Sequence, residues 1–230
     1  MELLLRLVLA HFLADFTLQT NYIARWKREN VSGGIAHSLI FFACSIVLCY
    51  ARLGQVWVTV GSLQVHGWIA LAALSFLHFC EDEWRVWTIK RLGTPDSVWF
   101  FLWDQCIHLI LVFVFAPLGP GRGLEKPVLL AILFILVTHF STIFVYYVEK
   151  GVLGSADIET QEKYYSMAER LVIALALLLP GWWALAMIGI LVFKFFFSRK
   201  FWEVTRLNLA IGSALSVLFG LCARYVFYYV

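Results

Sequence analysis

The chain has 230 residues, of which 62% are hydrophobic, 17% aromatic and only 14% charged, and its mean hydropathy is +0.82. Soluble domains carry about 25% charged residues, so this composition excludes an ordinary soluble globular protein. The net charge of +3 includes no long basic run, which argues against a nucleic-acid partner. We therefore predict an all-α integral membrane protein in the lipid bilayer, since the alternating pattern of a transmembrane barrel is missing.

Apolar runs predict eight helices in one polytopic transmembrane bundle, because about 20 apolar residues span the hydrocarbon core. In chain order, the expected ranges are 3–23, 34–53, 65–90, 97–117, 127–149, 164–180, 182–198 and 204–229. The sixth and seventh helices are short and joined by Pro180-Gly181, so a re-entrant hairpin or a single broken span, with seven crossings, is the alternative. We expect one membrane domain over residues 1–230, divided into a four-helix half at 1–117 and further helices at 127–229.

Lys and Arg gather after the first and third expected helices and between the seventh and eighth. The first two groups consist of Arg25, Lys27, Arg28, Arg85, Lys90 and Arg91. The positive-inside rule makes these loops cytoplasmic. Both termini are then expected on the outer side of the membrane.

Three of the expected helices carry a histidine and an aspartate four residues apart. They are His11 with Asp15, His78 with Asp82, and Asp104 with His108. Residues four apart share one helical face, and the third pair is reversed on a helix that runs the opposite way. The three pairs are therefore expected at matching depths near the cytoplasmic side, with His37 entering at the level of the aspartates.

An ionised aspartate in the middle of a membrane helix costs ~2.5–3.5 kcal/mol on the insertion scale, so three of them need a neutralising partner. We predict a divalent metal, preferably zinc, with iron or manganese as alternatives, because imidazole and carboxylate groups bind all three. The candidate ligands are His11, His37, His78, His108, Asp15, Asp82 and Asp104.

Two metal arrangements stay open. In one, three histidines hold a single metal while the aspartates orient them or act as a general base; in the other, mixed ligands hold two metals. A metal-free proton or ion pathway and interhelical hydrogen bonding are the remaining interpretations of this layer.

Polar residues of the C-terminal half are expected near the same pocket. Glu169 and Arg170 lie early in the sixth helix and Lys194 lies late in the seventh, so an ion pair there can close the pocket mouth; snorkelling to headgroups is the alternative. The candidate catalytic residues are Asp15, Asp82, Asp104, Glu169 and Lys194. The candidate substrate-binding residues are Gln19, Gln105 and Arg170.

The order of these motifs resembles an uncharacterised bacterial family of multi-pass membrane proteins, domain of unknown function 3307. The matching stretches are LAHFLADFTLQT, His37, LHFCED and FLWDQCIHL, followed by AERLVIALALL, GILVFKFF and LAIGSALSVLFG. The resemblance covers nearly the whole chain and implies a bacterial inner-membrane protein, but it implies no activity. Among the consecutive acids Glu81-Asp82-Glu83, the spacing favours Asp82 as the inward one.

A zinc site just beneath the cytoplasmic surface predicts a membrane hydrolase for a lipid or other amphipathic substrate. Bound zinc lowers the pKa of its water to about 7, and a spare aspartate can act as the base. A di-iron oxygenase or desaturase-like enzyme, a metal-ion or proton transporter, and a scaffold with a structural polar cluster are the alternatives. No sequence repeat of the kind common in transporters is found, and no pattern sets the oligomeric state.

Overall fold

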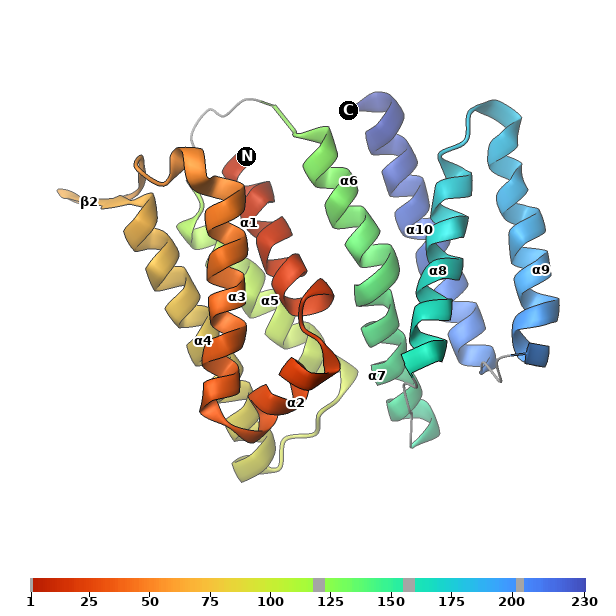
Figure 1. Ribbon diagram of the computed structural model, residues 1–230, viewed down its shortest axis with the longest axis horizontal. Helices are drawn as coiled ribbons and strands as arrows, with labels where there is room; N and C mark the ends of the chain where they lie inside the picture. The colour runs from red at the N-terminus through yellow and green to blue at the C-terminus, as the bar shows by residue number, and fades with distance from the viewer. Residues whose placement is uncertain (1, 118–122, 155–159, 202–204) are drawn as a thin grey trace. The chain divides into compact units, whose positions relative to one another are not determined.

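The computed structural model describes residues 2–117, 123–154, 160–201 and 205–230, with side chains from 163 to 196 in the third range. These residues are mainly helical, and their one sheet is a two-stranded hairpin (Figure 1). The predicted all-α class is therefore confirmed. Contacts divide the chain into two compact units, Met1–Val128 and Leu129–Val230.

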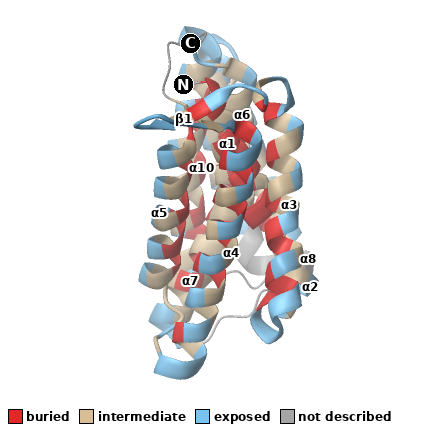
Figure 2. Cartoon of the chain, turned by 90° about the vertical axis from the view of Figure 1, so that its left-hand side faces the viewer, coloured by how far each residue is buried: buried red, intermediate tan, exposed pale blue. Residues whose placement is uncertain are grey.

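Four helices of the first unit form a ring. They are α1 (Glu2–Phe12), α3 (Val31–Cys49), α4 (Gly67–Leu92) and α5 (Val98–Phe115). Both α1 and α4 pack against α3 and α5, which closes the ring. Buried residues lie along the inner sides of these helices and exposed ones along the outer sides (Figure 2). The core contains Leu7, Phe41, Leu71 and Val112, so polar groups inside the ring are shielded from lipid.

Local sequence explains where these helices begin and end. The side chains of Asn30 and Ser97 accept hydrogen bonds from the backbone N–H groups of Ser32 and Phe100, which caps α3 and α5. Helix α4 ends at Leu92, and Gly93, the next residue, has a φ of +68°, the left-handed conformation that glycine adopts without strain.

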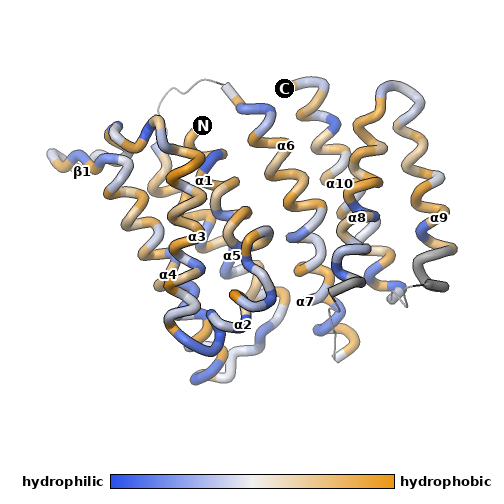
Figure 3. Tube along the Cα trace, in the orientation of Figure 1, coloured by the Kyte–Doolittle hydropathy of each residue, from blue (hydrophilic) through white to orange (hydrophobic). Residues whose placement is uncertain are grey.

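The predicted first helix, 3–23, is wrong beyond residue 17. Helix α1 continues as a π-helical turn, η1 (Leu13–Thr17), and α2 (Asn21–Glu29) then leaves at an angle of 89°. Part of α2 falls in a stretch expected to be a loop. Its one buried residue is Lys27, and hydrophilic residues gather along it (Figure 3), which is the pattern of a helix lying at a membrane surface.

The closeness of α2 and α3 depends on Gly33. A Cβ atom at this position would lie 2.4 Å from the backbone nitrogen of Lys27 and from the backbone carbon of Trp26. Backbone atoms cannot rotate away, so we expect Gly33→Ala to displace α2 and to destabilise the protein by about 1–3 kcal/mol. Thermal unfolding of the detergent-purified protein measures this. Gly151→Ala is the control, because a Cβ atom at that position has no neighbour within 4 Å. Equal melting temperatures for the two variants would contradict the expectation.

The connection between α3 and α4 was not predicted. It contains a 3-10 turn, η2 (Tyr50–Arg52), and an antiparallel hairpin of β1 (Val56–Val60) and β2 (Leu63–His66). The third predicted helix therefore begins at Gly67 instead of residue 65.

A bidentate ion pair joins α1 to the last segment of the first unit. Arg6 donates through Nε and Nη2 to the two carboxylate oxygens of Glu125, at 2.8 and 2.6 Å. The hydrogen bond from Arg6 lowers the pKa of the Glu125 carboxyl below its usual value. The pair fixes the position of the chain before α6, which begins at Lys126.

Long helices make up the second unit. A continuous rod consists of α6 (Lys126–Ile135), the π-helical turn η3 (Leu136–Phe140) and α7 (Ser141–Leu153). The remaining elements are α8 (Thr160–Leu177), the 3-10 turn η4 (Gly181–Leu185), α9 (Ala186–Phe201) and α10 (Arg206–Tyr229). Helix α8 packs against α9 and α10, so the sixth and seventh predicted helices are two separate helices, on either side of Pro180-Gly181.

Four helical stretches in the described residues are long and apolar enough to cross a membrane. They are Val31–Arg52, Val98–Phe115, Lys126–Leu153 and Arg206–Tyr229, and the bent pair of α1–η1 with α2 would make a fifth. Large apolar side chains on the outside, such as Val47, Phe76 and Trp99, are 63–78% exposed, as expected next to lipid. The chain is a membrane protein. By helix length and composition, however, the described residues give four or five candidate membrane spans, fewer than the predicted seven or eight crossings.

Candidate metal centre

All seven predicted metal ligands lie together inside the ring of the first unit. Each is at most 5% exposed. The α1–η1 segment supplies His11 and Asp15, α3 supplies His37, α4 supplies His78 and Asp82, and α5 supplies Asp104 and His108. The His/Asp pairs of three helices therefore converge as the sequence pattern indicates.

Four of these residues, Asp15, His37, His78 and Asp82, form what we call the central group. The Nε2 atoms of His37 and His78 lie 3.2 Å apart. Asp15 Oδ1 is 3.2 Å from the first of these nitrogens and 3.5 Å from the second. Asp82 Oδ2 is 3.5 and 3.6 Å from the same two nitrogens. Four ligand atoms from three segments of the chain thus lie next to one another.

The π-helical turn η1 carries Asp15 into the central group. Its wider turn is marked by the hydrogen bond from the Leu18 backbone nitrogen to the Leu13 oxygen, at 2.8 Å, which spans five residues instead of four. Such turns occur frequently at functional sites. His11, one turn earlier, lies with Nδ1 3.5 Å from Asp15 Oδ1 and with Nε2 3.2 Å from Gln105 Oε1.

A second set of potential ligands adjoins the first and shares Asp82 with it. We call Glu81, Asp82, Asp104 and His108 the lateral group; one ligand atom from each lies within 4.8 Å of the others. His108 Nδ1 is 3.0 Å from the backbone oxygen of Asp104, so this nitrogen must be the donor. Its Nε2, which lies 3.3 Å from Glu81 Oε2, therefore keeps its lone pair for a ligand.

Each aspartate has one oxygen held by a hydrogen-bond donor. Lys27 Nζ is 2.6 Å from Asp82 Oδ1, and Gln105 Nε2 donates to Asp15 Oδ2 and Asp104 Oδ2, at 3.2 and 3.1 Å. Arg85 Nη1 also lies 3.4 Å from Asp104 Oδ2. The opposite oxygens, which are Asp15 Oδ1, Asp82 Oδ2 and Asp104 Oδ1, are buried and make no hydrogen bond within the described residues.

Sequence reasoning missed Lys27 as part of this site. It was expected among the cytoplasmic loop charges, but it is only 9% exposed, and its ammonium group also donates to Gln19 Oε1 at 3.3 Å. The available signal was the spacing of Ile23, Ala24 and Lys27, which share one face of an amphipathic helix. Gln19, a predicted substrate-binding residue, lies between η1 and α2 and contacts this lysine.

Glu81 and Arg85 were missed as well. The spacing favoured Asp82 among three consecutive acids, and Asp82 does face inward; however, Glu81 is also buried and turned toward His108. Neighbouring helical residues point about 100° apart. Helix α4 can therefore direct Asp82 toward the central group and Glu81 toward His108 in the lateral group.

The predicted site residues of the C-terminal half belong to the second unit. Glu169 Oε2 and Lys194 Nζ lie 3.4 Å apart, so Glu169 pairs with Lys194. Arg170 is 1% exposed and donates instead to Thr142 Oγ1 and Asn208 Oδ1, at 2.6 and 3.1 Å. Their contribution to the metal centre stays a prediction.

A family model described as "Protein of unknown function (DUF3307)" matches residues 3–120. The match contains every residue of the central and lateral groups together with Lys27 and Arg85. No curated protein and no solved structure matches the chain significantly.

Proposed function

Because the chain belongs to the DUF3307 family of proteins of unknown function, we propose its activity from the metal centre alone: it is an integral membrane metalloenzyme. The reaction is hydrolysis of a lipid or another amphipathic substrate at the cytoplasmic side of the membrane, with zinc as the preferred metal. The observation that carries the proposal is the set of five distances, from 3.2 to 3.6 Å, among the ligand atoms of the central group.

These distances fit the edges of a tetrahedron around one metal ion. Zinc lies about 2.0–2.1 Å from imidazole nitrogen and about 2.0–2.2 Å from carboxylate oxygen, so two of its ligand atoms are about 3.3–3.5 Å apart. Five of the six possible edges in the central group are between 3.2 and 3.6 Å. The ligand atoms of Asp15, His37 and His78, which lie 3.2–3.5 Å from one another, are therefore placed to bind one ion.

A hydrogen-bonded polar core explains the arrangement less well. Buried polar atoms normally have hydrogen-bond partners, yet one oxygen of each of Asp15, Asp82 and Asp104 has none among the described residues. The partnered oxygen of each aspartate is held by Lys27, Gln105 or Arg85. Metal ligands are typically oriented by such outer partners, while the ligating atom points to the ion.

The lateral group supports a second ion next to the first. It offers three carboxylates and the available Nε2 of His108, and Asp82 belongs to both groups. The three sets of potential ligands found within 4.8 Å among the described residues all contain both histidines and carboxylates. The geometry therefore favours mixed ligands and two metals over three histidines around one. Two adjacent metal ions can clamp a substrate oxygen and supply hydroxide near neutral pH.

We infer that substrate enters from the side of α2. The ligands are almost fully buried, and α2 contributes Lys27 directly to Asp82 at the edge of the central group. An amphipathic helix at the membrane surface is able to shift without unfolding the ring.

We propose that α4 also crosses the membrane. It packs against both α3 and α5, and its acids point into the ring. Its charged residues keep it out of the set of clear membrane-spanning candidates.

The carboxylate-rich lateral group favours a second candidate, a di-iron or manganese oxygenase. Helical bundles that hold two iron ions use mostly carboxylates with a few histidines. Iron bound at two ions per chain, with an optical absorption that changes with oxygen, would select this function over zinc hydrolysis.

Metal analysis of the purified full-length protein tests the proposal. We expect one to two zinc ions per chain, hydrolysis of ester or phosphoester lipids that stops on chelation, and recovery on adding zinc. Asp15→Asn should lower bound metal and hydrolysis together, because an amide oxygen binds metal more weakly than a carboxylate oxygen and the new amide nitrogen cannot accept the hydrogen bond that Gln105 Nε2 donates to Asp15 Oδ2. A protein that binds no divalent ion, or an Asp15→Asn variant with normal metal content, would remove the basis of the proposal.

A further inference from the structure

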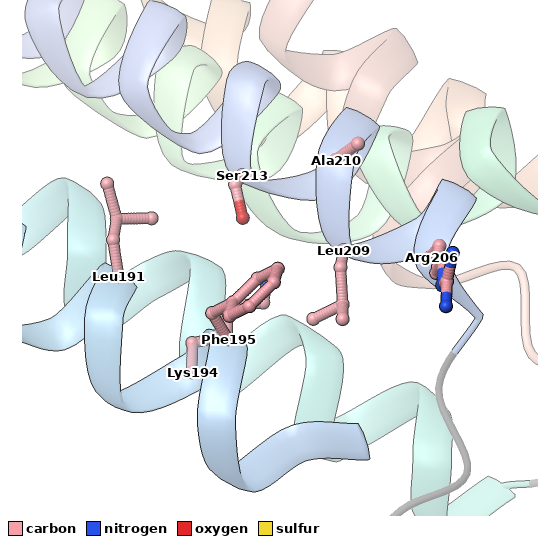
Figure 4. Close-up of a pocket in the computed structure, with 7 residues that line it drawn as sticks. All are labelled: Leu191, Lys194, Phe195, Arg206, Leu209, Ala210 and Ser213. Carbon is pink, nitrogen blue, oxygen red and sulfur yellow. The ribbon is translucent and has the colours of Figure 1, made fainter.

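The second unit contains a pocket of its own. It lies between α9 and α10, has a volume of about 600 Å³, and is shown in Figure 4. Its walls consist of Leu191, Lys194 and Phe195 from α9 and Arg206, Leu209, Ala210 and Ser213 from α10. A volume of this size holds a drug-sized molecule or part of a lipid.

Apolar and basic groups are unevenly placed around this pocket. Leu191, Phe195 and Leu209 line it along the helices, whereas Arg206 is the first residue of α10 and is exposed. The apolar walls suit an acyl chain, and the guanidinium group at one end suits an anionic headgroup. This combination is typical of an anionic amphiphile lying against membrane helices.

Lys194 adds a buried ammonium group to the wall. It is 4% exposed and lies 3.4 Å from a carboxylate oxygen of Glu169, which makes its burial tolerable. Buried Arg170, on the neighbouring α8, adds another cation, and it donates to uncharged side chains. Among the side chains that the structure describes on α8, α9 and α10, Arg170, Lys194 and Arg206 are basic, and two acids, Glu149 and Glu169, interact with them or with the start of α10.

We propose that this pocket binds an anionic phospholipid, with the headgroup phosphate at Arg206 and Lys194 and one acyl chain along Leu191, Phe195 and Leu209. The surroundings fit such an occupant: α10 is a candidate membrane span, and apolar residues of α9 outside the pocket, including Phe193 and Phe196, are 57–67% exposed. Basic pockets between membrane helices are known to hold anionic headgroups, and each basic residue near an anionic lipid surface contributes about fivefold in affinity.

Native mass spectrometry of the delipidated full-length protein tests this site. Phosphatidylglycerol and phosphatidylcholine of equal chain length are titrated separately. We expect the wild type to bind phosphatidylglycerol more tightly, and Arg206→Gln to reduce that preference about fivefold. Arg91→Gln removes one charge from an exposed position on α4 and should leave the preference unchanged.

A second variant tests the cavity instead of the charge. Ala210 lines the pocket and is exposed, so Ala210→Phe should fill the space without removing a core contact, and binding of both lipids should weaken. Equal affinity of the wild type for the two lipids, or an unchanged preference in Arg206→Gln, would overturn the proposal. Metal content should stay normal in both variants, which separates this test from that of the metal centre.

Discussion

A His78→Ala variant is expected to lose its bound metal and all metal-dependent hydrolysis. The ligand atoms of His78, Asp15 and His11 lie within 4.8 Å of one another, and so do those of His78, His37 and Asp82. His78 Nε2 lies 3.2–3.6 Å from the other three ligand atoms of the central group. Removing the imidazole leaves three ligands and an open volume, so we expect metal affinity to fall at least about 100-fold, more than the loss of an outer partner causes.

Metal content by elemental analysis and hydrolysis on the same preparations measure this effect. His66→Ala serves as the control, because His66 is exposed in the hairpin and only contacts the Gly54 backbone oxygen, at 3.0 Å. The control should keep both metal and activity. Wild-type metal content in His78→Ala would show that the central group does not hold an ion, and the buried polar layer would then have to be a proton pathway or a structural network.

The sequence was sufficient to predict the part of the site that depends on helical periodicity. A His and an Asp four residues apart must share a face, and the reversed pair on α5 restores the same order in space. His11, His78 and His108 therefore converge as expected, and their rings come within 4.2–5.6 Å of one another. Apolar length also predicted most of the helices, because it measures the thickness of the hydrocarbon core.

Two local features broke this periodicity and were not visible in the pattern. The π-helical turn η1 adds a residue to one turn, which changes the direction of the residues that follow, and the 89° bend then ends the first helix early. The apolar run through Ile23 hid this break, since hydropathy does not distinguish a spanning helix from one at the surface. Thr20, whose side chain accepts a hydrogen bond from the Ile23 backbone nitrogen, was the local sign of a new helix.

Tertiary contacts determined the remaining features of the site. Lys27 was predicted as a loop charge because basic residues after a membrane helix usually lie in the cytoplasm. Its burial depends on Gly33, which lets the C-terminal end of α2 pack closely against the start of α3. This packing decides that Lys27 on α2 reaches Asp82 on α4. Sequence spacing cannot predict such a contact, because the two residues lie on different helices.

Replacement of Lys27 is expected to have the second-largest effect, and its sign depends on the metal. In the metal-free protein Lys27 is the cation next to Asp82, at 2.6 Å, and both groups are buried. Removing one partner of a buried ion pair typically costs about 3–5 kcal/mol, because the other charge is left without compensation. Metal-free Lys27→Met should therefore be much less stable than the metal-free wild type.

Zinc should restore most of the lost stability, because an ion in the central group neutralises the Asp82 carboxylate through its other oxygen. That oxygen, Oδ2, lies 3.5 Å from His37 Nε2. Thermal unfolding of chelated and zinc-loaded samples measures the difference, and the rise in melting temperature on adding zinc should be larger in Lys27→Met than in the wild type. Lys90→Met, at an exposed position on α4, should behave like the wild type in both states. One cation can replace the other only if both interact with the same carboxylate. A Lys27→Met protein that is destabilised equally with and without zinc would therefore mean that Lys27 and the metal do not share Asp82.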